Sequence, residues 1–243
     1  MSKQQKPDRR SVVDEIRKSE KAAERRKGGM IIGVSVALGL LIIGAAAYKP
    51  VTDALSAREF KSKELSSIGA PASTCQDVTT SPANGMMDHV APGTPIDFEG
   101  SPPAFGTHYD SWEPMDRKFY GEDRPDLGFL VHNLEHGYTV LWYDETIADD
   151  KEQMDVVRGI ANKFDGDDMR NKFKAAPWTS DDGEPFPEGQ HVALTHWSAG
   201  GAGESDTSKQ VGVWQYCSEP SGEAVESFMT EYPYMDSPEP GGG

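Results

Sequence analysis

Residues 30–47 read MIIGVSVALGLLIIGAAA, a run of eighteen residues without a charged side chain. A helix of this length measures about 27 Å at 1.5 Å per residue, close to the roughly 30 Å thickness of a bilayer's hydrocarbon core. The buried helix of a soluble protein usually has a polar face, whereas this run is apolar on all sides. The sequence therefore predicts a transmembrane helix over residues 30–48.

The segment before this run, residues 1–29, holds ten Lys and Arg residues against five Asp and Glu residues. Because Lys and Arg concentrate on the cytoplasmic side of a span, we predict a cytoplasmic basic tail and a domain outside the cell membrane. A cleaved signal peptide is the alternative, since residues 45–47 (AAA) resemble a cleavage site. The long basic segment and the length of the apolar run favour an uncleaved, single-pass anchor.

The rest of the chain is acidic. Residues 49–243 hold 14 basic and 35 acidic side chains, so their formal net charge is about −21. This charge repels the phosphates of nucleic acids, and we expect no nucleic-acid partner. The basic tail is expected to contact anionic headgroups of the lipid bilayer.

The acidic part is expected to form one extracytoplasmic α+β domain with a small mixed or antiparallel sheet and flanking helices. We place a stalk at 49–72, the domain at 73–236 and a flexible tail at 237–243. Turn-forming residues dominate 67–110, and an amphipathic pattern predicts a helix over 149–174. Strand patterns cover 127–143, 191–197 and 211–216, and a short helix is expected at 223–232.

The chain has two cysteines, Cys75 and Cys217, and both lie on the predicted outer side of the membrane. An oxidising compartment favours a disulfide between them, which would join the start of the domain to its last strand. Two unlinked thiols or a copper-binding dithiolate are the alternatives.

The segment HNLEHG, residues 132–137, carries the most informative polar pattern. His132 and His136 share one face whether the backbone is a helical turn or a strand, and this spacing suits a metal ion. Glu135 would ligate the ion or orient an imidazole. The letters also match the H-x-x-E-H pattern of zinc peptidases, but Gly137 and the strand-like YTVLWY leave little room for a long active-site helix. We therefore do not expect an enzyme, and a zinc hydrolase stays an alternative.

Further candidate ligands precede this segment. Met86 and His89 lie in GMMDHVAPG, and His108 ends a Pro-Gly turn. A thioether beside imidazoles favours copper, especially Cu(I), over hard cations. We predict a copper site, with zinc as the alternative metal, whose candidate ligands are His108, His132, His136, His89, Glu135 and Met86.

The motifs together resemble a known family. HVAPGTP, SPPAFGTHYD and LVHNLEHGYTVLWY, in this order, are similar to DUF3105, a family of membrane-anchored or secreted proteins of actinobacteria, over about residues 75–240. Phe105 stands where the family pattern P-P-x-S-G-x-H-Y has a serine. The resemblance implies a fold and a set of characteristic histidines, and it implies no activity. Those histidines correspond to His89, His108, His132 and His136.

Three functions follow from these patterns as hypotheses. The first is metal handling at the cell envelope, as a chaperone, a store or a sensor. The second is a non-catalytic accessory subunit, with structural histidines, whose partner is a membrane protein complex or a metalloprotein. The third is a metallohydrolase that uses Glu135 as its general base.

Overall fold

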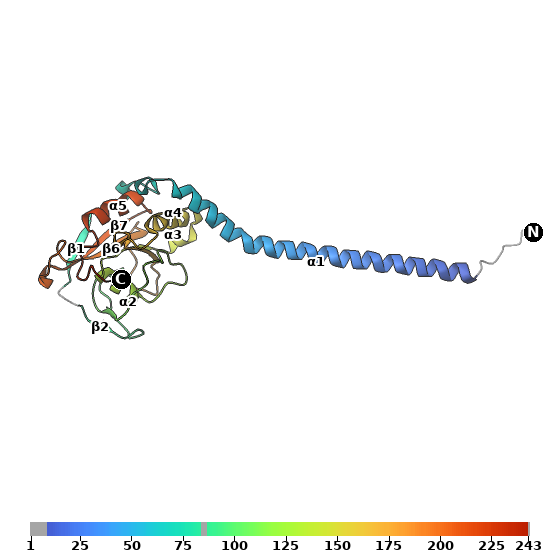
Figure 1. Ribbon diagram of the computed structural model, residues 1–243, viewed down its shortest axis with the longest axis horizontal. Coiled ribbons are helices and arrows are strands. Elements are labelled where there is room, and N and C mark those ends of the chain that lie inside the picture. Colours follow the sequence, from blue (N-terminus) through green and yellow to red (C-terminus); the bar gives the residue numbers. More distant parts are fainter. Residues whose placement is uncertain (1–8, 84–86, 243) are drawn as a thin grey trace, which may run out of the picture. The chain divides into compact units, whose positions relative to one another are not determined.

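The computed structural model describes residues 9–83 and 87–242 and divides the chain into two compact units, Met1–Ala54 and Leu55–Gly243. Helix α1 (Arg9–Lys61), blue in Figure 1, contains the apolar run. Among the described residues, one helical segment, Arg17–Tyr48, is long and apolar enough to cross a membrane, and its most apolar window is not buried. The predicted apolar N-terminal helix is confirmed, although a signal sequence has the same properties.

The second unit is built on a five-stranded mixed sheet whose strand order is β1-β7-β6-β4-β5. Strands β4 and β5 run parallel, and the other neighbours are antiparallel. A separate parallel ladder joins β2 (His89–Val90) to β3 (His108–Tyr109). The strands of the sheet are β1 (Thr79–Pro82), β4 (Thr139–Tyr143), β5 (Phe173–Pro177), β6 (Val192–Ser198) and β7 (Val211–Cys217).

The second unit contains α-helices as well as this mixed sheet, which confirms the predicted α+β class. The predicted strands at 191–197 and 211–216 correspond to β6 and β7, and the predicted helix at 223–232 corresponds to α5. The helices of this unit are α2 (Leu127–Glu135), α3 (Glu145–Asp149), α4 (Lys151–Ala161) and α5 (Gly222–Glu231). Short 3₁₀ turns lie at Leu65–Ser67, Ala72–Thr74, Asn162–Phe164, Met169–Asn171 and Thr207–Lys209.

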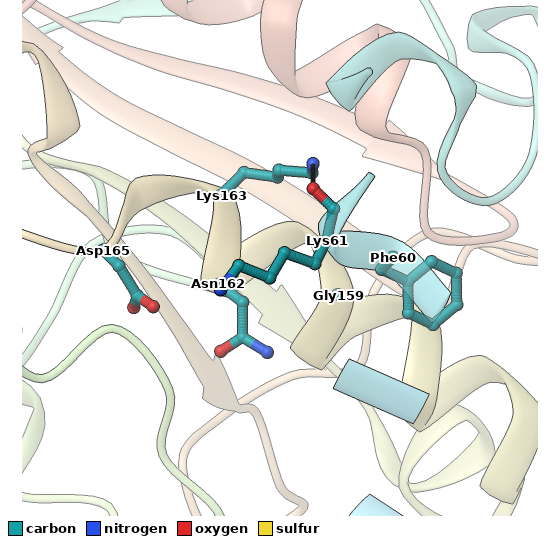
Figure 2. Close-up of a pocket in the computed structure, with 6 residues that line it drawn as sticks. All are labelled: Phe60, Lys61, Gly159, Asn162, Lys163 and Asp165. Atoms are coloured by element: carbon teal, nitrogen blue, oxygen red, sulfur yellow. Dashed lines mark hydrogen bonds between the residues drawn. The ribbon is translucent and has the colours of Figure 1, made fainter. Parts of the chain in front are cut away.

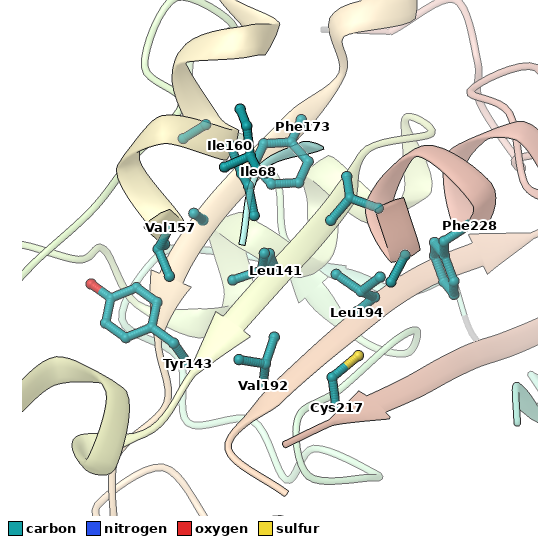
Figure 3. Close-up of a cluster of buried hydrophobic side chains, with 14 of the residues drawn as sticks. Ile68, Leu141, Tyr143, Val157, Ile160, Phe173, Val192, Leu194, Cys217 and Phe228 are labelled. Carbon is teal, nitrogen blue, oxygen red and sulfur yellow. The ribbon is translucent and has the colours of Figure 1, made fainter. Parts of the chain in front are cut away.

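The sheet separates two hydrophobic clusters because successive side chains of a strand point to opposite faces. In β4, Leu141 and Tyr143 pack with residues of α4 and α5 (Figure 3), while Val140 and Trp142 pack with residues of α2. Burying a large apolar side chain contributes about 1.5–3 kcal/mol. Apolar side chains of helices cover both faces of the sheet. Helix α2, which carries His132 and His136, packs on one of these faces.

The strand interpretation of 127–143 is wrong in its first half, because residues 127–135 form α2. A short apolar run cannot by its period alone be assigned to a strand or a helix. The helix ends where Gly137 adopts φ +90°, with the Gly137 N–H bonded to Leu134 O and the Tyr138 N–H bonded to Asn133 O. These two bonds form a Schellman motif, which glycine favours because it lacks a Cβ.

The predicted helix over 149–174 is also too long, because α4 ends at Ala161 and β5 begins at Phe173. Gly166, at φ +96°, lies in the loop between them. Lys172 and Lys174, at the end of the predicted helix, are fully buried. Their ammonium groups donate hydrogen bonds to backbone carbonyls, among them His136 O and Arg117 O.

Both ends of the second unit take part in its packing. Ile68, in the predicted stalk, is fully buried in the cluster on the α5 side. At the other end, residues 237–242, expected as a tail, fold back toward α2, and the Glu239 N–H donates to Glu135 O. A disulfide between Cys75 and Cys217 joins the start of the domain to β7, as predicted.

Candidate metal centre

The last turn of α2 presents three polar side chains on one face of the helix. His132, Glu135 and His136 are spaced i, i+3 and i+4, and such residues are neighbours on a helix surface. All three are nearly or fully buried. The C-terminal end of a helix carries a partial negative charge, so this end of α2 favours a cation.

The β2–β3 ladder brings two more imidazoles to the same place. Its register pairs His89 with His108. Strand β3 approaches α2 closely because Gly128 has no side chain: a Cβ there would lie 2.8 Å from the ring of Tyr109. His108 is fully buried, whereas the side chain of His89 is 38% exposed.

The ring nitrogens converge on one carboxylate oxygen, Oε2 of Glu135. Its distances to the Nε2 atoms are 3.0 Å for His108, 3.4 Å for His89 and 3.9 Å for His132. The Nε2 atoms of His89 and His108 are 3.1 Å apart. These four residues offer donor atoms that all lie within 4.8 Å of one another.

These separations match the coordination shell of a small metal ion. Tetrahedral bonds of 2.0–2.2 Å from nitrogen and oxygen place neighbouring donors about 3.3–3.6 Å apart. The distances to Glu135 Oε2, 3.0–3.9 Å, bracket this range. The four residues could therefore bind a metal ion without a large rearrangement.

Backbone carbonyls orient two of the rings. His108 Nδ1 lies 2.7 Å from Gly106 O, and His132 Nδ1 lies 2.6 Å from Tyr109 O. A carbonyl oxygen only accepts, so each Nδ1 carries a proton, and in the neutral ring Nε2 then holds a lone pair. An imidazole that donates from one nitrogen to a carbonyl while the other faces the site is the usual arrangement of a metal ligand.

Glu135 is fully buried, and its Oε1 has no hydrogen-bond partner among the described residues. Burial raises the pKa of this carboxyl, but the hydrogen bond from His108 and the charges of the neighbouring histidines outweigh burial and hold its pKa below the ordinary value. Burial lowers the pKa of His132. Metal binding requires an anionic carboxylate and neutral imidazoles, so a bound ion would replace the proton through which His108 Nε2 donates to Glu135.

His136 was predicted in the same group as His108 and His132, but the structure places it in an adjoining group with Glu135 and Glu239. Its Nε2 lies 3.1 Å from His132 Nε2 and 3.6 Å from Glu239 Oε2. Burial and then the charge of His132 lower the pKa of His136 to about 4. Glu239 was missed because it lies far along the sequence in a Pro-Gly segment without periodicity.

The sulfur ligand proposed from sequence is Met86, which lies outside the described residues. The sulfur of its neighbour Met87 accepts a hydrogen bond from the Gln210 side chain at 3.5 Å and belongs to the α2-side cluster. Among the described residues, the donors of the four-residue group are therefore nitrogen and oxygen atoms.

Two other histidines lie elsewhere. His191 Nδ1 is 2.8 Å from a carboxylate oxygen of Asp144. His196 is fully buried, and its ring nitrogens face Tyr138 O and Asp236 O.

A tryptophan that sequence reasoning missed covers the site. The ring of Trp112 lies 5.1 Å from that of His132 and 4.7 Å from that of His136, measured between centroids. Its loop is fixed by Asn133, whose side-chain amide exchanges two hydrogen bonds with the backbone of Glu113. Phe105, which replaces the serine of the family pattern, is buried against Trp197 and has no polar role.

Two surface cavities lie apart from the histidines. One, of about 340 Å³, is lined by Phe60, Gly159 and the polar side chains around them (Figure 2). The other, of about 400 Å³, lies beside Trp178. Neither is lined by a residue of the histidine groups.

The comparison with protein families agrees with the resemblance found from the histidine motifs. A family model described as "Protein of unknown function (DUF3105)" matches residues 89–242. Neither a curated protein nor a solved structure matches the chain. The matched region contains both histidine groups and spans more than half of the sequence, and the chain therefore belongs to the DUF3105 family.

Proposed function

We propose that this protein binds a transition-metal ion through His89, His108, His132 and Glu135, and that it handles this metal at the outer face of the cell envelope. One observation carries the proposal: two imidazoles, each oriented by a backbone carbonyl, direct Nε2 toward a buried carboxylate. A buried charge is costly unless it is paired or coordinates a metal, and a cation at the centre would neutralise Glu135.

We propose copper before zinc as the bound metal. Imidazole nitrogens suit copper, zinc, iron and nickel, whereas Cu(I) prefers sulfur ligands. Three imidazoles and one carboxylate therefore fit Cu(II) or Zn(II). Because affinities for a given site generally follow an order in which Cu(II) exceeds Zn(II), copper is the tighter ion.

Four protein ligands close the coordination shell, which is typical of a site that holds a metal rather than one that uses it in catalysis. Within the group, His89 is the ligand open to solvent, so the ion would enter and leave past it. A hydrolase would need Glu135 free to act on a bound water, but the histidine nitrogens surround this carboxylate. Storage, transfer or sensing of the metal suits the arrangement better than hydrolysis.

The apolar helix and the disulfide indicate a secreted or membrane-anchored extracytoplasmic domain. We further propose that the helix is an uncleaved anchor, with the basic N-terminus in the cytoplasm and the acidic domain outside. In this arrangement residues 1–29 contact anionic lipid headgroups.

The proposal is tested by titrating the full chain, purified in detergent without a polyhistidine tag, with Cu(II) and Zn(II). Tryptophan fluorescence reports Cu(II) because the ring of Trp112 lies 5.1 Å from the ring of His132. His108→Ala and His132→Ala should each weaken metal binding by more than about tenfold. Even the loss of a residue that only hydrogen-bonds to a metal ligand lowers metal affinity by about tenfold or more. His191→Ala, outside both groups, is the matched control.

Wild-type affinity in both ligand variants would contradict the proposal. If those variants bound metal normally but unfolded more easily, the histidines would be structural and the accessory-subunit hypothesis would be favoured. Melting curves of the metal-free proteins distinguish this case from loss of the fold.

A further inference from the structure

We infer that the site holds a second metal ion, bound by Glu135, His136 and Glu239, and that Glu135 bridges the two ions. The inference rests on the proposed function, since the first ion occupies the site assigned above. It extends that function from a single ion to a dinuclear centre.

The donors of the second position lie together beside the first. Glu135, His136 and Glu239 offer ligand atoms within 4.8 Å of one another. The Nε2 atoms of His132 and His136 are 3.1 Å apart, so the two positions adjoin. In two-metal sites the ions are about 3.5–4 Å apart, a spacing that one shared carboxylate can span.

Two buried atoms of Glu135 and His136 have no hydrogen-bond partner among the described residues. Glu135 directs Oε2 toward His108, while its Oε1 has no hydrogen-bond partner among the described residues. Nδ1 of His136 is likewise buried and unpaired within the described part of the chain. Leaving a buried polar atom unpaired costs about 1–3 kcal/mol, so such atoms in a native fold call for a ligand. A bridging carboxylate uses both of its oxygens.

The C-terminal segment supplies the third donor. Its backbone is fastened to α2, because the Glu239 N–H donates to Glu135 O and Lys172 Nζ donates to both His136 O and Pro240 O. Gly242 packs against the ring of His136, where a Cβ would lie 2.4 Å from Nε2. This attachment leaves the carboxylate of Glu239 free, 52% exposed and 3.6 Å from His136 Nε2.

The two positions differ in their chemistry. The first has four protein donors, whereas the second has three and keeps one position for water or an external ligand. The exposed Glu239 places the second ion next to solvent. The second ion is therefore the one that exchanges more readily and that an incoming ligand can reach.

The test is elemental analysis of the full chain after equilibrium dialysis against Zn(II). Wild type should retain two equivalents, Glu239→Gln and His89→Ala one each, and Glu135→Gln none. Both ions should be lost at once only when the replaced residue is a ligand of both. Glu188→Gln, an exposed glutamate far from α2 in sequence, is the control and should retain two. Because Glu239 is exposed, its replacement by Gln should leave the fold intact.

One equivalent in wild type that Glu239→Gln does not reduce would overturn the second position and leave the proposed function standing. No metal in wild type would overturn both. A second readout tests the bridge: two Cu(II) ions that share a carboxylate couple magnetically, so the paramagnetic resonance signal per copper should be weaker in wild type than in Glu239→Gln. Equal signals per copper would overturn the shared Glu135.

Discussion

Replacing Glu135 by Gln should abolish the stabilisation that a bound metal gives to the domain. The substitution preserves the shape of the side chain but removes the anionic oxygen that lies 3.0 Å from His108 Nε2 and 3.4 Å from His89 Nε2. Glu135 is fully buried, and Gln in its place offers the metal only a neutral amide oxygen. We therefore expect metal affinity to fall at least about hundredfold, the upper end of what loss of an outer-shell partner costs.

The size of the effect follows from linkage between binding and unfolding. At a metal concentration about 100 times the dissociation constant, a ligand of the native state stabilises it by about 2.7 kcal/mol. For a domain of 150–250 residues this raises the melting temperature by about 5–11 °C. After a hundredfold loss of affinity the same concentration equals the dissociation constant, which leaves about 0.4 kcal/mol and less than about 2 °C.

The assay is thermal unfolding of the full chain in detergent, with and without Zn(II), for wild type, Glu135→Gln and the control Glu188→Gln. Comparing each protein with its own metal-free form removes any effect of the substitution on the fold. A metal-induced shift in Glu135→Gln as large as in wild type would refute the assignment of Glu135 as a ligand.

Three further predictions concern the rest of the molecule. Reducing the Cys75–Cys217 bond, which spans a sequence separation of 142, should lower the free energy of unfolding by about 4–5 kcal/mol in the chain-entropy model. Denaturant titration with and without reductant checks this, and an unchanged midpoint would contradict it. Burial lowers the pKa of Lys174 to about 7, so the unfolded chain binds more protons above that pH. Between pH 7 and pH 10 the free energy of unfolding should therefore rise more steeply in wild type than in Lys174→Met, by up to about 1.4 kcal/mol per pH unit. Equal slopes in the two proteins would contradict this prediction. Finally, a reporter that is active only outside the cytoplasm should work when fused after Gly243 and fail before Met30, and activity of the N-terminal fusion would reverse the topology.

Strong patterns made much of the fold predictable. The apolar run needs only its length and composition to be identified. Strands β6 and β7 were found within one or two residues because their β-branched and aromatic residues lie between turn signals. By contrast, β5 was missed because its parallel partner β4 is distant in sequence and because buried Lys174 resembles a solvated residue.

In the candidate site, too, local spacing was predictable and tertiary contacts were not. His132 and His136 were predictable as a pair because their spacing places them on one face of either a helix or a strand, whereas Glu135 joins that face only in a helix. His89 and His108 were nominated by residue type, but only the two-residue β2–β3 ladder brings them to α2.

Two residues near the site had no signal in the sequence. Glu239 and Trp112 reach the histidines through tertiary contacts, the first by the bond from its N–H to Glu135 O and the second through the loop fixed by Asn133. Neither contact follows a period or a motif. Contacts of this kind require the three-dimensional structure.

The most direct test of the central claim is the metal content of the full chain purified from its own host without a polyhistidine tag. We predict at least one equivalent of copper or zinc in wild type and a loss of that equivalent in the variant His108→Ala/His132→Ala, which removes both carbonyl-oriented imidazoles. Equal metal content in wild type and in this double variant would contradict the account.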